Sequence, residues 1–401
     1  MTLFPYDEGN LKPMLKELDL WRKRLDFRGT LPRRWEGRLR RELEAEAVAA
    51  STAMEGVPVT VDEVRRILAG EEPPEVEPEN RELVEGYRQA MDYVLRRADD
   101  PAFEWNRELI VGLHDRILAG RYEQGAGRIR TEAPTFVVNR LTGEQVFVPP
   151  PGQEVPQLVE KACQVMQEGT AHPAVASAWI HVAIGAIHPF RDGNGRAARV
   201  LASLAMYRGG FTRREFTSLE EWWGRHLGDY YAAFECLGAR FNPDAEVTPF
   251  IEVHVNAQLQ QVRILDLRER VQREVWVVLE EIAEDAHLDR RIANALWDAF
   301  FGREVSAGYY RSLADVGRAT ASTDLGSAVS AGLLRARGER RGRRYEADER
   351  LFVLVSDALG LEHAPGPADA MKDRIISVLG DRLTWSGEAF GFPRRPFDGG
   401  A

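Results

Sequence analysis

The chain has 401 residues, of which 44% are apolar, 29% charged and 9% aromatic, and its formal net charge is -10. This composition excludes disordered, collagen-like and disulfide-stapled classes, and the length predicts two or three domains, each with its own core. The acidic balance excludes binding of nucleic acid or anionic membranes by bulk charge, so any basic surface must be local. The two cysteines, Cys163 and Cys236, are expected to be buried thiols rather than a disulfide or a metal site.

Targeting signals are not apparent in the sequence. Charged residues such as Asp7, Lys12 and Glu17 interrupt residues 1–20, which is unlike a secretory signal peptide. The longest nearly apolar stretch, Ala174–Ile187, is too short to span a membrane. The sequence therefore predicts a cytoplasmic protein with no membrane partner.

The first part of the chain, residues 1–104, is expected to be a helical domain. Helical periodicity and strong helix formers predict three helices in it, over Leu11–Leu25, Trp35–Glu55 and Arg81–Arg97. Gly56 and then Pro58 end the second helix, and the acidic, proline-rich run Glu71–Glu79 is expected to be a loop.

Residues 105–250 are expected to form a second domain. Two short strand-like runs, Thr135–Val138 and Gln145–Val148, are joined by Asn139–Glu144 and predict a β-hairpin. The expected helices of this domain cover Glu108–Ala119, Val155–Glu168, Ala174–Ile187 and Arg196–Tyr207. The third of them is apolar on most sides, which predicts a buried central helix.

The remaining part, residues 251–386, is expected to contain linker helices and a small domain. Its short helices are predicted over Leu288–Phe300, Tyr309–Val316 and Ala321–Ala331, ahead of a hairpin over Arg335–Tyr345. This order is typical of a winged helix-turn-helix. The glycine- and proline-rich tail, residues 387–401, is expected to be disordered. The fold class predicted for the whole chain is mainly α.

The hairpin of this last domain is a local basic cluster. Residues Arg335–Arg344 hold six arginines against one acid, Glu339, which is enough charge to contact phosphates. The helix that would enter the DNA groove, Ala321–Ala331, carries one charge, Asp324, and no Arg or Asn. DNA binding therefore stays open beside a domain used for dimerisation or target docking.

The most informative segment is residues 188–199, which read His-Pro-Phe-Arg-Asp-Gly-Asn-Gly-Arg-Ala-Ala-Arg. Gly193, Asn194 and Gly195 form a loop that runs into a helix start. Successive backbone N–H groups point outward there, and the helix dipole adds partial positive charge. We expect this loop to bind an anion.

The side chains around this loop suit phosphate chemistry. Asp192 is a hard oxygen ligand suited to Mg²⁺ or Mn²⁺, with substrate phosphates completing the shell. Arg196 and Arg199 lie three apart on one helix face, so both can reach one polyphosphate. A neutral His188 can take a proton from an incoming hydroxyl. The nucleophile is expected to come from another molecule, because no catalytic Ser or Cys pattern accompanies these residues.

This segment resembles the signature of Fic domains, His-Pro-Phe-x-Asp/Glu-Gly-Asn-Gly-Arg-x-x-Arg, at every specified position. The similarity extends to Gly127–Arg130, to the hairpin with Phe147–Pro151 and to Tyr230–Ala233. Fic enzymes transfer AMP from ATP to a hydroxyl side chain of a target protein. The resemblance implies a Fic helical core with a β-hairpin flap, residues 135–148, that pairs with an extended stretch carrying the target Ser, Thr or Tyr.

The resemblance also implies residue roles. His188 would be the general base and Asp192 the Mg²⁺ ligand. The predicted ATP contacts are Gly193, Asn194, Gly195, Arg196, Arg199, Tyr230 and Tyr231. For the two tyrosines, adenine stacking and a core position both stay open. Family members that transfer the γ-phosphoryl group replace the second Gly and first Arg of the motif, so their presence here favours nucleotidyl transfer.

Residues Ser51–Gly56 match the inhibitory motif Ser/Thr-x-x-x-Glu-Gly/Asn of autoinhibited Fic proteins. Glu55 ends a predicted helix, where a carboxylate is unfavourable unless a cation meets it, and Arg199 is the cation that the resemblance supplies. Ser51 lies one turn earlier on the same face and is placed to orient Glu55. In some family members this glutamate instead supports AMP removal, so de-AMPylation stays open.

Two function classes remain open at this point. One is an AMP transferase that acts on a target protein, and the other is a DNA-binding transcriptional regulator whose Fic module senses nucleotide. The complete set of His188, Asp192 and Arg196 favours the enzyme, because a sensor does not require the base. Self-modification, homodimerisation and DNA contact through residues 309–345 are further open possibilities.

Overall fold

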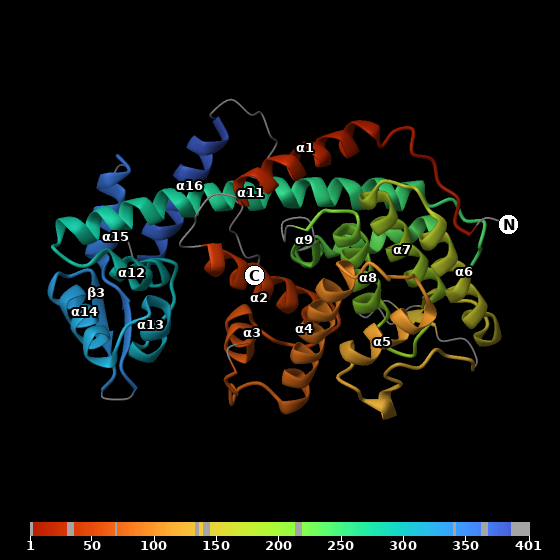
Figure 1. Ribbon diagram of the computed structural model, residues 1–401, viewed down its shortest axis with the longest axis horizontal. Helices are drawn as coiled ribbons and strands as arrows, with labels where there is room; N and C mark the ends of the chain where they lie inside the picture. The colour runs from red at the N-terminus through yellow and green to blue at the C-terminus, as the bar shows by residue number, and fades with distance from the viewer. Residues whose placement is uncertain are drawn as a thin grey trace. The chain divides into compact units, whose positions relative to one another are not determined.

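A computed structural model describes residues 3–29, 36–68, 70–132, 136–138, 145–212, 219–339, 342–361 and 368–385. The chain divides into two compact units, Met1–Val262 and Arg263–Ala401 (Figure 1). The described residues are mainly helical, as the sequence predicts.

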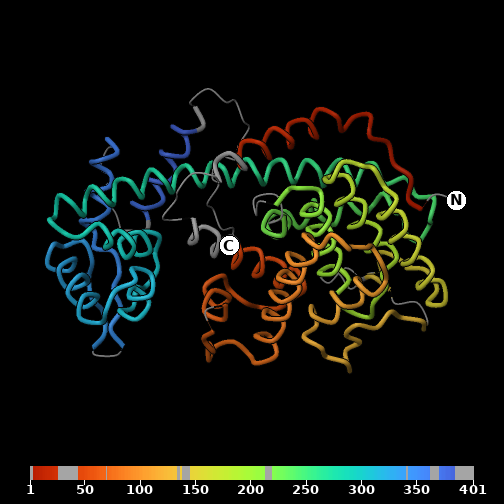
Figure 2. Tube along the Cα trace, in the orientation of Figure 1, coloured from red at the N-terminus to blue at the C-terminus, as the bar shows by residue number. Residues whose placement is uncertain are grey.

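The N-terminal helices of the first unit are α1 (Lys12–Gly29), α2 (Glu36–Met54), α3 (Val61–Leu68) and α4 (Pro78–Ala98). Figure 2 traces α2, α3 and α4 side by side, and each of them packs against the other two. The helix α4 begins at Pro78, whose fixed φ suits the first turn, so the predicted loop is slightly shorter than expected.

The rest of this unit continues with α5 (Arg107–Ile117), α6 (Val155–Glu168), α7 (Pro173–Ile187), α8 (Asn194–Arg208), α9 (Leu219–Arg225) and α10 (Leu227–Ala233). Short 3₁₀ turns occur at Tyr122–Gln124, Gly152–Glu154 and Phe234–Leu237. The sequence predicted a domain boundary between residues 104 and 105, whereas the structure puts both sides into one unit. The physical reason is packing: α4 lies against α5 and α8, and α2 lies against α9.

The centre of the first unit is the pair α7 and α8, which pack along each other. Almost all of α7 is buried, as its apolar sequence predicts. Pro173 and the His172 side chain, which accepts the N–H of Ala174, start this helix. It ends at His188 in the left-handed conformation, and the chain then turns into α8.

The predicted β-hairpin is present in its described part. Strands β1 (Val137–Val138) and β2 (Gln145–Phe147) are antiparallel, with Val137 opposite Phe147 and an irregular register between the two β1 residues. Residues 133–135 and 139–144 of the predicted flap lie outside the described residues.

The long helix α11 (Thr248–Asp285) contributes residues to both units. The sequence predicted only linker helices here, because the apolar positions of a helix partnered on several sides lack one clear face.

The other elements of the second unit are the 3₁₀ turn Arg290–Ile292, α12 (Ala293–Phe300), α13 (Ala307–Ala314), α14 (Arg318–Ser330), β3 (Leu334–Arg337), β4 (Arg344–Ala347), α15 (Glu349–Ala358) and α16 (Ala368–Trp385). Strands β3 and β4 form the antiparallel hairpin that the sequence predicts, and Val305 bridges to Tyr345 of β4. Residues 340–341 of the arginine-rich hairpin and the tail 387–401 lie outside the described residues.

Within the described ranges, no helix combines the length and apolar character needed to cross a bilayer. The predicted cytoplasmic location stays a prediction.

Candidate functional site

The motif loop between α7 and α8 is held by its own residues. His188 has φ 49° at the end of α7, and Gly193 has φ 74° at the start of α8, so the chain reverses between two left-handed residues. The Asn194 side chain accepts the N–H of Phe190 and donates to the carbonyl of the same residue, both at 2.9 Å. Asn194 therefore closes the loop with its side chain, which leaves its backbone for the predicted anion contact.

His114, a buried residue of α5, supports this loop with hydrogen bonds at both ring nitrogens. His114 Nδ1 accepts the N–H of Gly127 at 3.1 Å, so Nε2 carries the proton and donates to the carbonyl of Asp192 at 2.8 Å. The imidazole stacks flat on Phe190, with ring centroids 3.6 Å apart. Burial lowers the pKa of His114 to about 4, which keeps this neutral tautomer in place at neutral pH.

Arg130 ties the motif loop to the segment that follows β2. Its Nε donates to the carbonyl of His188 at 2.7 Å, and one terminal nitrogen donates to the carbonyls of Pro150 and Ile187. Its backbone N–H donates to Pro189 at 2.9 Å. A guanidinium with several fixed donors is suited to this task, and it holds the backbone of His188 in a strained conformation.

His188 is the candidate general base. Its Nδ1 lies 3.4 Å from the carbonyl of Gly185, the preceding turn of α7. Burial, with the positive charge of Arg130 adding to it, lowers the pKa of His188 to about 4. The imidazole is therefore neutral at pH 7 and able to accept a proton.

Asp192 and Arg196 lie together at the start of α8. One carboxylate oxygen of Asp192 accepts the N–H of Gly193 at 2.7 Å, and the other lies 3.6 Å from a terminal nitrogen of Arg196. The Asp192 side chain is 52% exposed, whereas that of Arg196 is 3% exposed. An accessible single carboxylate beside a phosphate-binding loop fits Mg²⁺, which typically takes one or two carboxylates and completes its shell with phosphates and water.

Arg199 makes the densest set of contacts in the site. Its guanidinium donates to Glu55 at 3.1 Å, to the Ser51 hydroxyl at 3.0 Å and to the Ser51 carbonyl at 3.1 Å. The side chains of Arg199 and Glu55 are 3% and 13% exposed, so water screens this ion pair weakly. A Cβ at Gly195 would lie 2.4 Å from a Glu55 carboxylate oxygen. The carboxylate of Glu55 therefore rests directly on the predicted anion loop.

The two tyrosines of α10 have different surroundings. Tyr230 is buried among aromatic rings, and its hydroxyl lies 3.4 Å from Arg199 and 3.2 Å from His181 Nε2. Tyr231 is 56% exposed and meets Tyr230 edge-on. Tyr230 thus contacts Arg199, and adenine stacking by either tyrosine stays a prediction.

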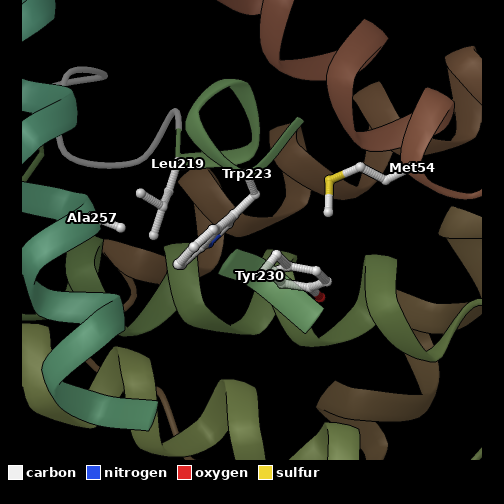
Figure 3. Close-up of a cluster of buried hydrophobic side chains, with 5 residues drawn as sticks. All are labelled: Met54, Leu219, Trp223, Tyr230 and Ala257. Atoms are coloured by element: carbon white, nitrogen blue, oxygen red, sulfur yellow. The ribbon is translucent and has the colours of Figure 1, made fainter. Parts of the chain in front are cut away.

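An apolar cluster fixes the end of α2 beside the site. It consists of Met54, Leu219, Trp223, Tyr230 and Ala257. Figure 3 shows the Met54 side chain pointing toward the ring of Tyr230. Because Met54 precedes Glu55, this packing sets where the Glu55 carboxylate lies.

Sequence reasoning missed His114 as a supporting residue, and it noted Arg130 only as part of a similar flanking segment. A lone histidine on a helix gives no signal in a single sequence, since its partners Gly127 and Asp192 are remote from it along the chain.

Part of the chain matches a known protein family. The model of the Fic/DOC family matches residues 104–206. The matched segment runs from just before α5 to near the end of α8, and it includes the whole motif loop, His114 and Arg130. It excludes Ser51, Glu55 and the second unit.

Similar proteins carry the same family name. The protein adenylyltransferase Fic of Nematostella vectensis is 28% identical over 192 residues, which are 46% of this chain and 41% of that protein. The protein adenylyltransferase fic-1 of Caenorhabditis elegans is 36% identical over 104 residues, 25% of this chain and 19% of that protein. The chain therefore spans less than half of the length of these curated relatives.

A solved structure shares the fold over a larger part of the chain. The crystal structure of a Fic family protein from Desulfovibrio desulfuricans G20 covers 84% of this chain and 96% of its own, with a TM-score of 0.54 and 20% identity. At this identity the likeness shows the fold alone.

Proposed function

We propose that this chain is a protein adenylyltransferase that transfers AMP from ATP to a Ser, Thr or Tyr hydroxyl of a target protein, and that Glu55 inhibits it. The observation that carries the proposal is the juxtaposition of a neutral, partly buried His188 with a glycine loop and two buried arginines on one helix start. The names of the similar proteins support the same reaction class.

The reaction follows from the positions of these groups. His188 takes the proton of the target hydroxyl while that oxygen attacks the α-phosphorus. The bond from the α-phosphorus to the bridging oxygen breaks, and pyrophosphate leaves. The α8 N-terminus, Arg196 and Arg199 hold the charge that develops on the β- and γ-phosphates.

Asp192 would hold the Mg²⁺ or Mn²⁺ ion that accompanies ATP. When bound, this ion offsets phosphate charge. A terminal nitrogen of Arg196 lies 3.6 Å from the second carboxylate oxygen of Asp192 and would help to orient that side chain for the ion.

The inhibition is a competition for Arg199. Glu55 presents a carboxylate where the γ-phosphate would bind, and it also fills the space above Gly195. ATP can bind Arg199 only after this ion pair opens. The same carboxylate could instead orient a water toward an AMP-modified target, so de-AMPylation belongs to this proposal as a second reaction of the site.

The test uses ATP labelled at the α- or the γ-phosphate, with the wild-type protein and the Glu55→Gly variant. We expect α-label on protein, a mass gain of one AMP, and about 100-fold more of it with Glu55→Gly, since a charge-assisted pair contributes about 2–3 kcal/mol. Equal labelling by both proteins would contradict the inhibition. Labelling from the γ-phosphate would contradict AMP transfer.

DNA binding by the second unit is a second candidate function. One observation favours it: Asp324, the single acid of α14, does not face solvent. It is bound by Arg291 at 2.7 Å and by the Tyr310 hydroxyl at 2.8 Å. The outer face of α14 is left with Arg318 and small polar residues, beside the exposed arginines of the β3–β4 hairpin.

Fluorescence anisotropy with a labelled random-sequence duplex tests this candidate. A DNA-binding unit would lose about 10²-fold or more in affinity between 50 and 200 mM salt, and Arg343→Gln would weaken binding at both concentrations. The matched control is Arg290→Gln, an exposed arginine paired with Glu284. Absence of binding at 50 mM salt would leave dimerisation or target docking as the role of this unit.

A further inference from the structure

A short chain of hydrogen bonds leads from Arg199 to a second carboxylate. Arg199 Nε donates to the Ser51 hydroxyl at 3.0 Å, and Ser51 in turn hydrogen-bonds the Tyr87 hydroxyl. The Tyr87 hydroxyl donates to Glu220 Oε1 at 2.7 Å. All four residues are buried. A buried cation is thus connected to a buried carboxylate other than Glu55.

A longer series of hydrogen bonds also begins at the guanidinium of Arg199. Arg199 can only donate, so the Tyr230 oxygen accepts from it, and the Tyr230 proton goes to His181 Nε2, 3.2 Å away. His181 therefore carries its proton on Nδ1 and donates to His254 Nε2 at 3.1 Å. This leaves the His254 proton on Nδ1. Because Arg199 can only donate, it sets the tautomers of both His181 and His254.

This longer series of hydrogen bonds ends at a small cavity. The cavity is lined by buried residues, including Arg199, Glu220, Trp223, His254 and Gln258, and its volume is about 10 Å³. Within the described ranges, four buried polar atoms around it have no hydrogen-bond partner in the protein: Glu220 Oε2, Trp223 Nε1, His254 Nδ1 and Gln258 Oε1. They come from two helices, α9 and α11. Unsatisfied groups of this kind are costly unless something binds them.

The four atoms are two donors and two acceptors, which is the set that one water molecule can satisfy. Trp223 Nε1 and His254 Nδ1 are donors, while the amide oxygen of Gln258 and the carboxylate of Glu220 are acceptors. A water accepts two hydrogen bonds and donates two, and a cavity of about 10–15 Å³ holds one. A water here would connect His254 to Glu220. Both series of hydrogen bonds would then lead from Arg199 to the same carboxylate.

We propose that Glu220 is the permanent counter-ion and positioning residue of Arg199, through a closed hydrogen-bond circuit completed by one buried water. The phosphate-binding role of Arg199 in this inference rests on the proposed function. When nucleotide displaces Glu55, Arg199 loses one of its partners, and a buried guanidinium without compensation is unstable and free to shift. Glu220, whose carboxylate accepts a hydrogen bond from Tyr87, keeps it in place. Glu55 is the reversible partner and Glu220 the fixed one.

The positioning role is tested by nucleotide binding in the Glu55→Gly background, where Arg199 is open to phosphate. Glu220→Gln should raise the Kd for ATP about tenfold, the loss of one charge-assisted contact. The Kd for AMP should stay unchanged, because AMP lacks the β- and γ-phosphates. Tyr87→Phe, which removes the donor to Glu220, should raise the ATP Kd by a smaller factor and also spare AMP.

Glu221→Gln is the matched control. Glu221 is the next residue of α9 and is as deeply buried, but it pairs with Arg225 and Gln261. An equal ATP Kd in the two glutamine variants would overturn the positioning role, and so would an equal loss of AMP binding by Glu220→Gln. Failure of Glu55→Gly itself to bind ATP would overturn the proposed function, and the positioning role with it.

The buried water is tested separately, by a crystal structure of the wild-type protein at about 1.8 Å. We expect one water within about 3.2 Å of all four lining atoms. It should be lost or displaced in Trp223→Phe, which removes one of its donors. A direct bond between His254 Nδ1 and Glu220, or a cavity without water density, would overturn this part.

Discussion

The two arginine clusters of the chain differ in how their side chains are held. Arg196 and Arg199 of α8 are 2% and 3% exposed, and Arg199 has a named partner on each nitrogen. Arg335 and Arg337 of β3 have side chains 45% and 62% exposed, and both pair with Glu346. The same residue type is fixed in one unit and solvated in the other.

The difference shows what burial adds to an arginine. A buried guanidinium held by several partners has one position, so it can select one phosphate geometry, but it needs a counter-charge at all times. An exposed arginine on a hairpin needs no such partner, and it contributes a diffuse, salt-sensitive field. The first arrangement suits catalysis and inhibition, and the second suits a surface contact.

The largest effect on AMP transfer is expected for His188, the proposed general base beside the buried arginines. His188→Ala should lower AMP transfer by the Glu55→Gly variant at least about 10³-fold, as loss of a general base does. His287→Ala is the control, because His287 also follows a helix with a positive φ but is exposed in the second unit. Activity of His188→Ala within tenfold of its parent would place the chemistry elsewhere.

An arginine-to-lysine exchange compares the clusters directly. Arg199→Lys should raise the KM for ATP about tenfold or more in the Glu55→Gly background, since one ammonium cannot replace several fixed donors. Arg343→Lys on the hairpin should leave KM and kcat unchanged. Steady-state kinetics with both variants checks this, and similar KM values would mean that burial does not matter at Arg199.

Loss of His114, which supports the motif loop, should lower kcat less than loss of a residue of the loop itself. His114→Leu keeps the apolar contact with Phe190 but removes the hydrogen bonds to Gly127 and Asp192, so we expect kcat to fall about tenfold as the loop loosens. His226→Leu is the control, a histidine stacked in the same way on Trp222. An unchanged kcat would show that Phe190 and Asn194 hold the loop alone.

The last prediction concerns stability against pH rather than catalytic rate. Burial lowers the pKa of His114 and of His188 to about 4, and that of His254 to about 3. The unfolded chain takes up protons below about pH 6.5 that the folded chain does not, so the free energy of unfolding should fall between pH 6.5 and 5 by at most about 1.4 kcal/mol per pH unit for each histidine. Urea unfolding of the full chain at pH 7, 6 and 5 measures this. A midpoint that stays constant or rises would contradict buried, neutral histidines.

The sequence alone determined the local features of this protein. The apolar run of α7, the glycines of the motif loop and the hairpin of the second unit each follow from spacing within a few residues, and the structure has them nearly where expected. The contact between Glu55 and Arg199 was also anticipated, although only through a family resemblance. The joining of residues 1–104 and the following helices in one unit was not anticipated, because packing between helices cannot be read from a single sequence.

Only the tertiary structure decided which side chains support the site. Glu220, His254 and Gln258 look like ordinary helix residues, and nothing in their spacing links them to Arg199. Folding places α9 and α11 beside α8, so that a cation, a carboxylate and two histidines are removed from water together. Their chemistry depends on that shared burial, which arises between segments remote in the chain and which no local pattern encodes.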